Sequence, residues 1–168
     1  MKQLILLLAC LLVLPVASMA NGEDQCRNMN GQAFFQEWQE PCVIDDSFDF
    51  CIPTKIKGTI NGSWVSFFQY EWLVVLEDLG VPTPPDSVET WYNREYEVFT
   101  SKQGEIWGDG QAVYDIRVGI MGGSAISIMV TGGTEMYEDA YGWITATILD
   151  PYFEHFSIDG RVCGPNVP

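Results

Sequence analysis

Two tyrosines flank an arginine at two-residue spacing in the segment WYNREYEV, residues 91–98. Because side chains alternate between the two faces of a strand, Tyr92, Arg94 and Tyr96 share one face if this segment is extended. If that face turns into a lumen, Arg94 is a cation among aromatic rings, and a buried arginine needs a partner, which is often a ligand. Tyr114, on the apolar face of a later predicted strand, is a fourth candidate for contact with a ligand in the lumen.

The opposite orientation of the same segment explains the pattern slightly better. Its other face carries Trp91, Asn93, Glu95, Glu97 and Phe99. The glutamates would then face inward on a frayed strand, or the arginine would extend its charged end into solvent at a rim.

Few other residues offer the groups that catalysis usually needs. His155 is the only histidine and lies on the polar face of the last predicted strand, where we expect it to be solvated. No nucleophile elbow of the GxSxG type surrounds Ser124 or Ser127. A single histidine and the lack of a CxxC pair argue against a zinc site, so we expect neither a metal nor a cofactor. A glycosidase pair of carboxylates stays open, because 23 acidic residues supply many pairs.

Residues 1–20 have the pattern of a secretory signal peptide. Lys2 precedes an apolar run, and Ser18 and Ala20 place small residues before a cleavage site, which predicts Asn21 as the mature N-terminus. A transmembrane anchor is the competing interpretation, but the run is short and no charged stop signal follows it. We therefore expect a secreted protein without a membrane anchor.

The charge of the chain limits its partners. A net charge of −15 repels nucleic acid and anionic membranes, so we expect neither as a partner. Asn61 begins the sequence NGS, which is a glycosylation sequon. It can be used only on an accessible surface in a eukaryotic secretory pathway, where a glycoprotein is expected.

Alternation of apolar and polar residues predicts an all-β protein. In residues 104–120 one face is apolar or small and the other is mostly polar, which is typical of a half-buried antiparallel strand. Residues 124–132 and 141–149 are β-branched runs flanked by glycines, and residues 152–163 alternate again. Many strands at short spacing indicate a sandwich or a closed barrel.

The rest of the chain fits one domain with an N-terminal addition. Residues 21–53 lack periodicity and are predicted to be an N-terminal extension held by cysteines, whereas residues 54–168 form the β-barrel domain. Residues 63–80 alternate but end in a helix-stop signal, and a strand is favoured there. Residues 81–86, VPTPPD, are expected to be a loop within the domain.

The turn TGGTEMYEDAYG, residues 131–142, joins two of the predicted strands. It resembles the turn of the allene oxide cyclase and dirigent superfamily, in which Gly-Gly-Thr/Ser-Gly is followed by an aromatic residue and Ala-x-Gly. The matching residues are Gly132, Gly133, Thr134, Tyr137, Ala140 and Gly142. The resemblance covers roughly residues 88–162 and implies a closed eight-stranded antiparallel barrel, commonly trimeric, whose lumen takes one hydrophobic molecule.

Two residues of this turn depart from the family pattern. Glu135 stands where the family usually has a glycine, and Asp139 often replaces another. A glutamate would be strained at a position that needs a positive φ. The glycines are expected to serve backbone geometry, and none of the family's catalytic residues has a match in this chain.

Four cysteines, Cys26, Cys42, Cys51 and Cys163, remain after the signal peptide and predict two disulfides. In a closed barrel with an even number of strands the first strand pairs with the last, antiparallel. If residues 54–60 are the first strand, this topology predicts a Cys51–Cys163 disulfide at the seam and a Cys26–Cys42 disulfide in the extension. The alternative is a local Cys42–Cys51 disulfide with Cys26 joined to Cys163.

Two classes of function follow from these features. The first is a secreted barrel that binds a small hydrophobic molecule in its lumen and steers its cyclisation or coupling, as the resemblance implies. The second is a secreted lipid- or glycan-binding protein without turnover. A homotrimer or another homo-oligomer is expected from the resemblance.

Overall fold

The computed structural model describes residues 24–82, 87–117, 120–150 and 154–168. These residues contain nine β-strands and three short 3-10 helices. The strands are β1 Gln25–Phe35, β2 Phe50–Gly58, β3 Gly62–Phe68, β4 Leu73–Val75, β5 Ser87–Ser101, β6 Gly104–Arg117, β7 Ile120–Gly133, β8 Tyr141–Ile148 and β9 His155–Gly164. The 3-10 helices are η1 Tyr70–Trp72, η2 Leu76–Leu79 and η3 Glu135–Tyr137. The predicted signal peptide, residues 1–20, lies outside the described residues.

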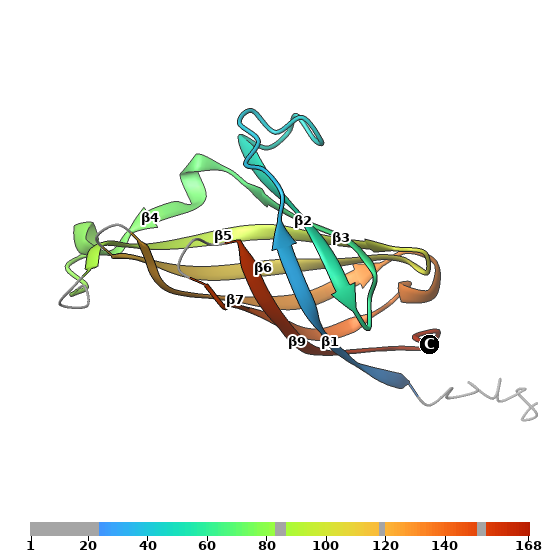
Figure 1. Cartoon of the computed structure of the whole chain (residues 1–168). Coiled ribbons are helices and arrows are strands. Elements are labelled where there is room, and N and C mark those ends of the chain that lie inside the picture. The colour runs from blue at the N-terminus through green and yellow to red at the C-terminus, as the bar shows by residue number, and fades with distance from the viewer. Residues whose placement is uncertain (1–23, 83–86, 118–119, 151–153) are drawn as a thin grey trace, which may run out of the picture.

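Eight of these strands close into an antiparallel barrel, as the sequence predicted. The order around the ring is β3-β2-β1-β9-β8-β7-β6-β5, and pairing of β3 with β5 completes it. In Figure 1 strands β1, β2 and β3 cross in front of β5, β6 and β7. The short strand β4 also pairs with β5, beyond the point where β3 ends, and η1 lies between β3 and β4 in the chain. Closure pairs the backbone of every barrel strand on both sides.

The first barrel strand is β1, which lies within the segment that was predicted to be an extension. It pairs along its length with β9, and Cys26 lies directly opposite Cys163. These two cysteines form one disulfide, and Cys42 and Cys51 form the other. The predicted Cys51–Cys163 and Cys26–Cys42 pairing is therefore wrong and the alternative pairing is correct. A disulfide does join the first barrel strand to the last, but the first strand is β1 and not residues 54–60.

The composition of β1 explains why its pattern was missed. Within Gln25–Phe35 only Met29 and Ala33 are buried, and the position between them that faces inward is Gly31. A strand with so few large apolar residues gives little alternation. The boundary at residue 54 therefore falls inside β2 and does not mark the start of the barrel.

Strand β6 follows the predicted alternation. Its inward residues from Ile106 to Tyr114 are buried, and its outward residues from Glu105 to Val113 are partly or fully exposed. The buried apolar side chains form a large core cluster that includes residues of eight strands, β1, β2, β3, β5, β6, β7, β8 and β9, and a smaller cluster of Phe50, Ile52 and Phe68. Phe35 packs against both clusters. The segment 63–80, for which a strand was favoured, is strand at 62–68 and 73–75 and turns through η1 and η2 elsewhere.

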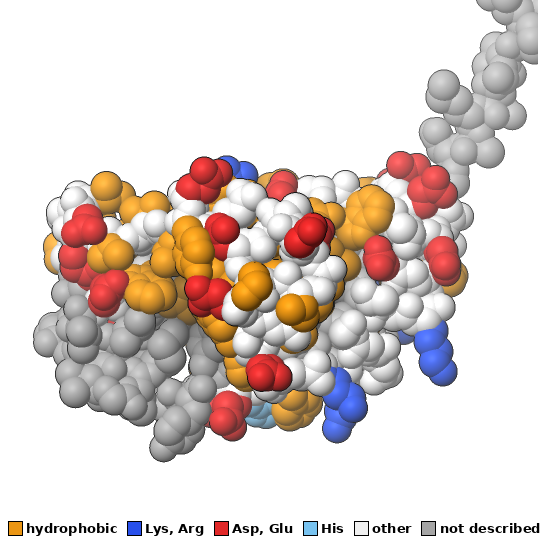
Figure 2. All heavy atoms as spheres, turned by 90° about the horizontal axis from the view of Figure 1, so that it is seen from above, with side chains coloured by type: hydrophobic (Ala, Val, Ile, Leu, Met, Phe, Trp, Pro, Cys, Tyr) orange, Lys and Arg blue, Asp and Glu red, His pale blue; other side chains and the backbone are white. Residues whose placement is uncertain are grey.

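The surface is acidic without a single dominant patch in the view of Figure 2, which looks down on the loop between β1 and β2. Red carboxylate side chains are scattered there among orange hydrophobic ones, with few blue side chains. This distribution agrees with the net charge of −15. Among the described residues, no helix has the length and apolar character needed to cross a membrane.

Candidate functional site

A cavity of about 380 Å³ lies at one end of the barrel. The antiparallel strands bring the ends of β1, β3 and β6 and the starts of β2 and β5 to this end. Its lining is Phe35, Trp38, Phe50, Ile52, Phe68, Tyr70, Leu73, Trp91, Asn93 and Tyr114. Trp38 and Tyr70 are 46% and 52% exposed, so the cavity reaches the surface beside them. We call this cavity the mouth cavity.

Stacked aromatic rings form one wall of the mouth cavity. The ring of Phe50 lies 4.5 Å from that of Trp38 and 4.5 Å from that of Phe68, and both pairs are close to parallel. Phe50 and Phe68 are buried, and Tyr70 packs against Phe50 at a ring distance of 5.5 Å. Packed rings of this kind have little freedom to move, so the wall is preformed.

Two residues with polar side chains lie at the inner end of the mouth cavity. Asn93 and Tyr114 line it and are 3% and 7% exposed. The Tyr114 hydroxyl donates a hydrogen bond of 2.6 Å to Oε1 of Glu95. Oδ1 of Asn93 has no hydrogen-bond partner among the described residues. This oxygen is itself buried beneath the lining, so the surface that the cavity presents to a ligand is apolar.

Two buried glutamates lie directly behind this polar end, and we call them the acid pair. Glu95 is 2% exposed and Glu97 is 0% exposed. Nε1 of Trp64 donates a hydrogen bond of 2.6 Å to Oε2 of Glu97. The two carboxyl groups lie close enough for the charge of Glu95 to raise the pKa of Glu97.

Burial sets the protonation of the acid pair. Removal from water raises the pKa of Glu97 well above its ordinary value, and the charge of Glu95 raises it further. Burial also raises the pKa of Glu95, against the opposing effect of its hydrogen bonds to Glu97 and Tyr114. The pair therefore holds a proton at a pH where exposed glutamates are ionised.

A glycine on β6 makes room for the acid pair. Gly110 lies opposite Glu95 and Gly108 lies opposite Glu97 in the β5–β6 register. A Cβ atom on Gly110 would lie 2.6 Å from Oε1 of Glu97 and 3.1 Å from its Cγ, whereas a Cβ atom on Gly108 would meet Ile128 of β7 at 2.5 Å. Gly110 thus leaves the space into which Glu97 fits.

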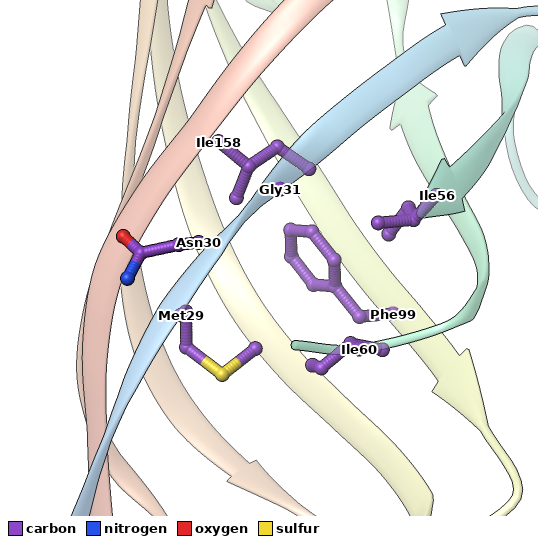
Figure 3. A pocket seen from close by; sticks show the side chains of 7 residues that line it. All are labelled: Met29, Asn30, Gly31, Ile56, Ile60, Phe99 and Ile158. Carbon is purple, nitrogen blue, oxygen red and sulfur yellow. The ribbon is translucent and has the colours of Figure 1, made fainter. Parts of the chain in front are cut away.

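An apolar layer closes the barrel beyond the acid pair. Figure 3 shows side chains of Met29, Ile56, Ile60, Phe99 and Ile158 converging from β1, β2, β5, β9 and the turn after β2. The cavity that they leave is about 10 Å³, which is the room of at most a single water molecule. Phe99 stacks on Trp64 at 5.4 Å, so this layer packs directly on the partner of Glu97.

Of the four predicted lumen residues, the structure places only Tyr114 inside. Arg94 is exposed on the outer face, with its guanidinium 6.0 Å from the ring centre of Trp72. Tyr96 packs outside the barrel against Phe48, at a ring distance of 6.2 Å. Tyr92 faces outward as well, at the position paired with Val74 of β4. The orientation with inward glutamates is therefore the correct one.

Both faces of β5 are covered, which is why its sequence pattern misled. The acid pair and Asn93 fill the inner face, whereas the outer face carries a small cluster with Phe67 and the Cys42–Cys51 disulfide. The aromatic residue Tyr96 on the outer face is therefore partly buried, and in the sequence it looks like a residue that faces the lumen. The signal for the true orientation was Gly110, since a small inward residue on β6 leaves space for a large side chain on β5.

The 131–142 turn shapes the backbone at the end of the barrel away from the mouth cavity. Gly132 and Gly142 have φ of 153° and 140°, and a Cβ on Gly142 would lie 2.0 Å from the carbonyl oxygen of Arg161. Tyr137 is buried and its hydroxyl donates to Oε1 of Gln103 at 3.4 Å. Thr134 precedes η3 and Ala140 is buried beside it.

Asn61 and His155 lie away from the mouth cavity lining. Asn61 is exposed in the β2–β3 turn, where its side chain bonds back to the backbone of Gly58, and its glycosylation stays a prediction. His155 is half-buried and its ring stacks on Phe34 at 4.8 Å, so the expectation of a solvated histidine was wrong. Among the described residues, no group of three or more acidic, histidine or cysteine side chains could hold a metal ion.

No protein-family model matches this chain, and no curated protein or solved structure has significant similarity to it. The resemblance to the allene oxide cyclase and dirigent superfamily therefore rests on the turn residues and on the strand order around them.

Proposed function

We propose that this barrel binds one small, largely apolar molecule in the mouth cavity. The observation that carries the proposal is a preformed cavity of about 380 Å³ whose walls are aromatic and aliphatic side chains. Ligand sites typically have volumes of about 300–1,000 Å³ and mostly apolar walls. The mouth cavity has both features.

Apolar contact supplies most of the affinity in this proposal. Each Å² of apolar surface that leaves water contributes about 25 cal/mol, and the lining offers aromatic and aliphatic surface on most sides. A polyhydroxylated glycan fits this lining poorly, so a lipid-like ligand is favoured over a glycan.

Steering of a cyclisation or coupling is a second proposed function. A rigid stack of Trp38, Phe50 and Phe68 can hold a reactive ligand in one conformation, which is the contribution that such reactions need from a protein. The resemblance of the 131–142 turn also favours it. Secretion belongs to the same proposal, and two disulfides are compatible with an oxidising compartment.

Calorimetric titration with 1-naphthalenemethanol tests binding at the mouth cavity. We expect one equivalent to bind, with the negative heat-capacity change of apolar burial. Ile52→Trp fills the cavity and should weaken affinity by about tenfold or more, equal to about 1.4 kcal/mol. Val113→Trp adds the same ring to the exposed outer face of β6 and should leave affinity unchanged.

Arg94→Ala provides a second control. Because Arg94 lies outside the barrel over Trp72, its removal should not alter affinity for 1-naphthalenemethanol. Absence of binding to the wild-type protein, or equal binding by Ile52→Trp with the fold intact by circular dichroism, would reject the proposal.

A further inference from the structure

The polar atoms in the inner lining of the mouth cavity are turned away from its interior. The indole N–H of Trp91 donates a hydrogen bond to Oε1 of Glu89. The hydroxyl of Tyr114 donates to Oε1 of Glu95, at 2.6 Å. Oδ1 of Asn93 is buried beneath the lining. Donors that already bond to a carboxylate gain little by turning to another acceptor, so the interior offers a ligand no hydrogen-bond partner.

The other inner lining residues have hydrocarbon side chains, which are those of Phe35, Phe50, Ile52, Phe68 and Leu73. A hydroxyl group that enters this interior gives up its hydrogen bonds to water and finds none in exchange, which lowers affinity. A water molecule that followed it would meet the same apolar walls, where it lacks the two or more polar partners that hold a buried water.

Polar groups are available at the opposite end, where the cavity reaches the surface. Trp38 and Tyr70 are exposed there, and both donate to the carboxylate of Glu40, Trp38 through Nε1 at 3.4 Å and Tyr70 through its hydroxyl. Glu40 is exposed, and with Tyr70 it also lines a neighbouring surface hollow that contains Asp46 and Asp49. A hydroxyl group at this end can donate to a carboxylate or bond to water.

We infer that the mouth cavity takes a single-headed alcohol, an apolar molecule with one hydroxyl group, which lies with its apolar end inside and its hydroxyl at the mouth beside Glu40. This inference rests on the proposed function and specifies its ligand class. Terpene alcohols and aromatic alcohols have this form. A molecule with hydroxyl groups at opposite ends does not, because one of them must enter the apolar interior.

Three naphthalenes of nearly the same shape test the inference. They are 1,5-diethylnaphthalene, (5-ethyl-1-naphthyl)methanol and 1,5-naphthalenedimethanol, in which hydroxyl groups replace terminal methyl groups one at a time. The first hydroxyl stays at the mouth, so we expect it to change the dissociation constant by less than about threefold. The second must enter the interior and should weaken binding by about tenfold or more, equal to about 1.4 kcal/mol. Displacement of 1-naphthalenemethanol, followed by calorimetry, measures all three.

Ile52→Asn tests whether the missing partner causes the second loss. Ile52 lines the cavity one inward position deeper along β2 than Phe50, so an amide there supplies the interior with a donor and an acceptor. The diol should then bind within about threefold of the single alcohol. Val113→Asn adds the same amide to the exposed outer face of β6 and should leave the tenfold difference unchanged. If Ile52→Asn fails to fold, the three naphthalenes on the wild-type protein decide.

Equal binding of the diol and the single alcohol by the wild-type protein overturns the inference and leaves the proposed function standing. A tenfold loss at the first hydroxyl, or an unchanged difference in a folded Ile52→Asn variant, does the same. Failure of all three naphthalenes to bind overturns both the inference and the proposed function.

Discussion

The indole N–H of Trp64 donates a 2.6 Å hydrogen bond to Oε2 of Glu97, and both side chains are buried inside the barrel. This contact joins β3 to β5 across the strand pair that closes the ring. It holds the carboxyl group of Glu97 in place above the apolar layer at Phe99, which stacks on the same indole. A carboxylate in such a position is a cost to stability unless a proton or a ligand neutralises it.

The first prediction concerns the pH dependence of stability. Burial raises the pKa of Glu97 above that of the unfolded chain, so the folded state holds the proton over a range in which the unfolded state loses it. Stability therefore falls as pH rises from about 4.3, the unfolded pKa, up to the raised folded pKa, by about 1.4 kcal/mol per pH unit. Glu97→Gln should remove this loss, so its stability relative to wild type should increase with pH.

Urea unfolding of both proteins at pH 5, 6, 7 and 8 measures this difference. The amide introduced by Glu97→Gln keeps an oxygen for the indole of Trp64, so the variant should fold. The exposed Glu138→Gln variant should parallel wild type at every pH. A wild-type-to-Glu97→Gln difference that does not change with pH would mean that Glu97 is ionised in the folded protein.

The second prediction concerns the glycine that accommodates the acid pair. Gly110→Ala places a Cβ 2.6 Å from Oε1 of Glu97, and overpacking of this kind costs about 1–3 kcal/mol. In a Glu97→Ala background the two nearest obstructing atoms are gone and only the Cβ of Glu95, at 3.2 Å, stays close, so the same substitution should cost less. A double-mutant cycle by urea unfolding gives the coupling, and additive losses would show that Gly110 does not make room for Glu97.

The sequence predicts the fold more fully than it predicts the site. The all-β class and the faces of β6 follow from alternation, because the outer face of β6 meets solvent and its inner face meets the core, whereas the closed eight-stranded barrel was implied by the resemblance of the 131–142 turn. The face of β5 could not be chosen in this way, since Tyr96 outside and Glu97 inside are both covered. Strand β1 was missed because its two buried side chains, Met29 and Ala33, lie four residues apart.

The third prediction compares the two disulfides. Cys26–Cys163 spans 137 residues and Cys42–Cys51 spans 9. In the chain-entropy model the long loop contributes about 5 kcal/mol and the short loop about 2.5 kcal/mol. Double alanine variants of each pair should show this order in urea unfolding. A larger loss from the Cys42–Cys51 variant would mean that the loop between β1 and β2 matters more than the β1–β9 seam.

The fourth prediction concerns Glu135 and Asp139, the two residues of the 131–142 turn that differ from the superfamily turn that it resembles. Glu135 and Asp139 have φ of 54° and 58°, which is left-handed backbone that favours glycine. Glu135→Gly should stabilise the protein by up to about 1 kcal/mol, and Asp139→Gly by less, because aspartate tolerates this region better than glutamate.

Glu138→Gly is the matched control for the turn. Glu138 has φ of −55°, so a glycine there relieves no strain and only adds freedom to the unfolded chain. It should destabilise the protein by about 0.5–1 kcal/mol. If thermal unfolding shows the same loss for Glu135→Gly, the turn is unstrained at that position.

A crystal structure of the protein with 1-naphthalenemethanol tests the central claim most directly. Ligand binding in the mouth cavity predicts electron density for the naphthalene ring beside Trp38 and Trp91. Density confined to the outer surface of the barrel, or an empty mouth cavity at saturating ligand, would contradict the account.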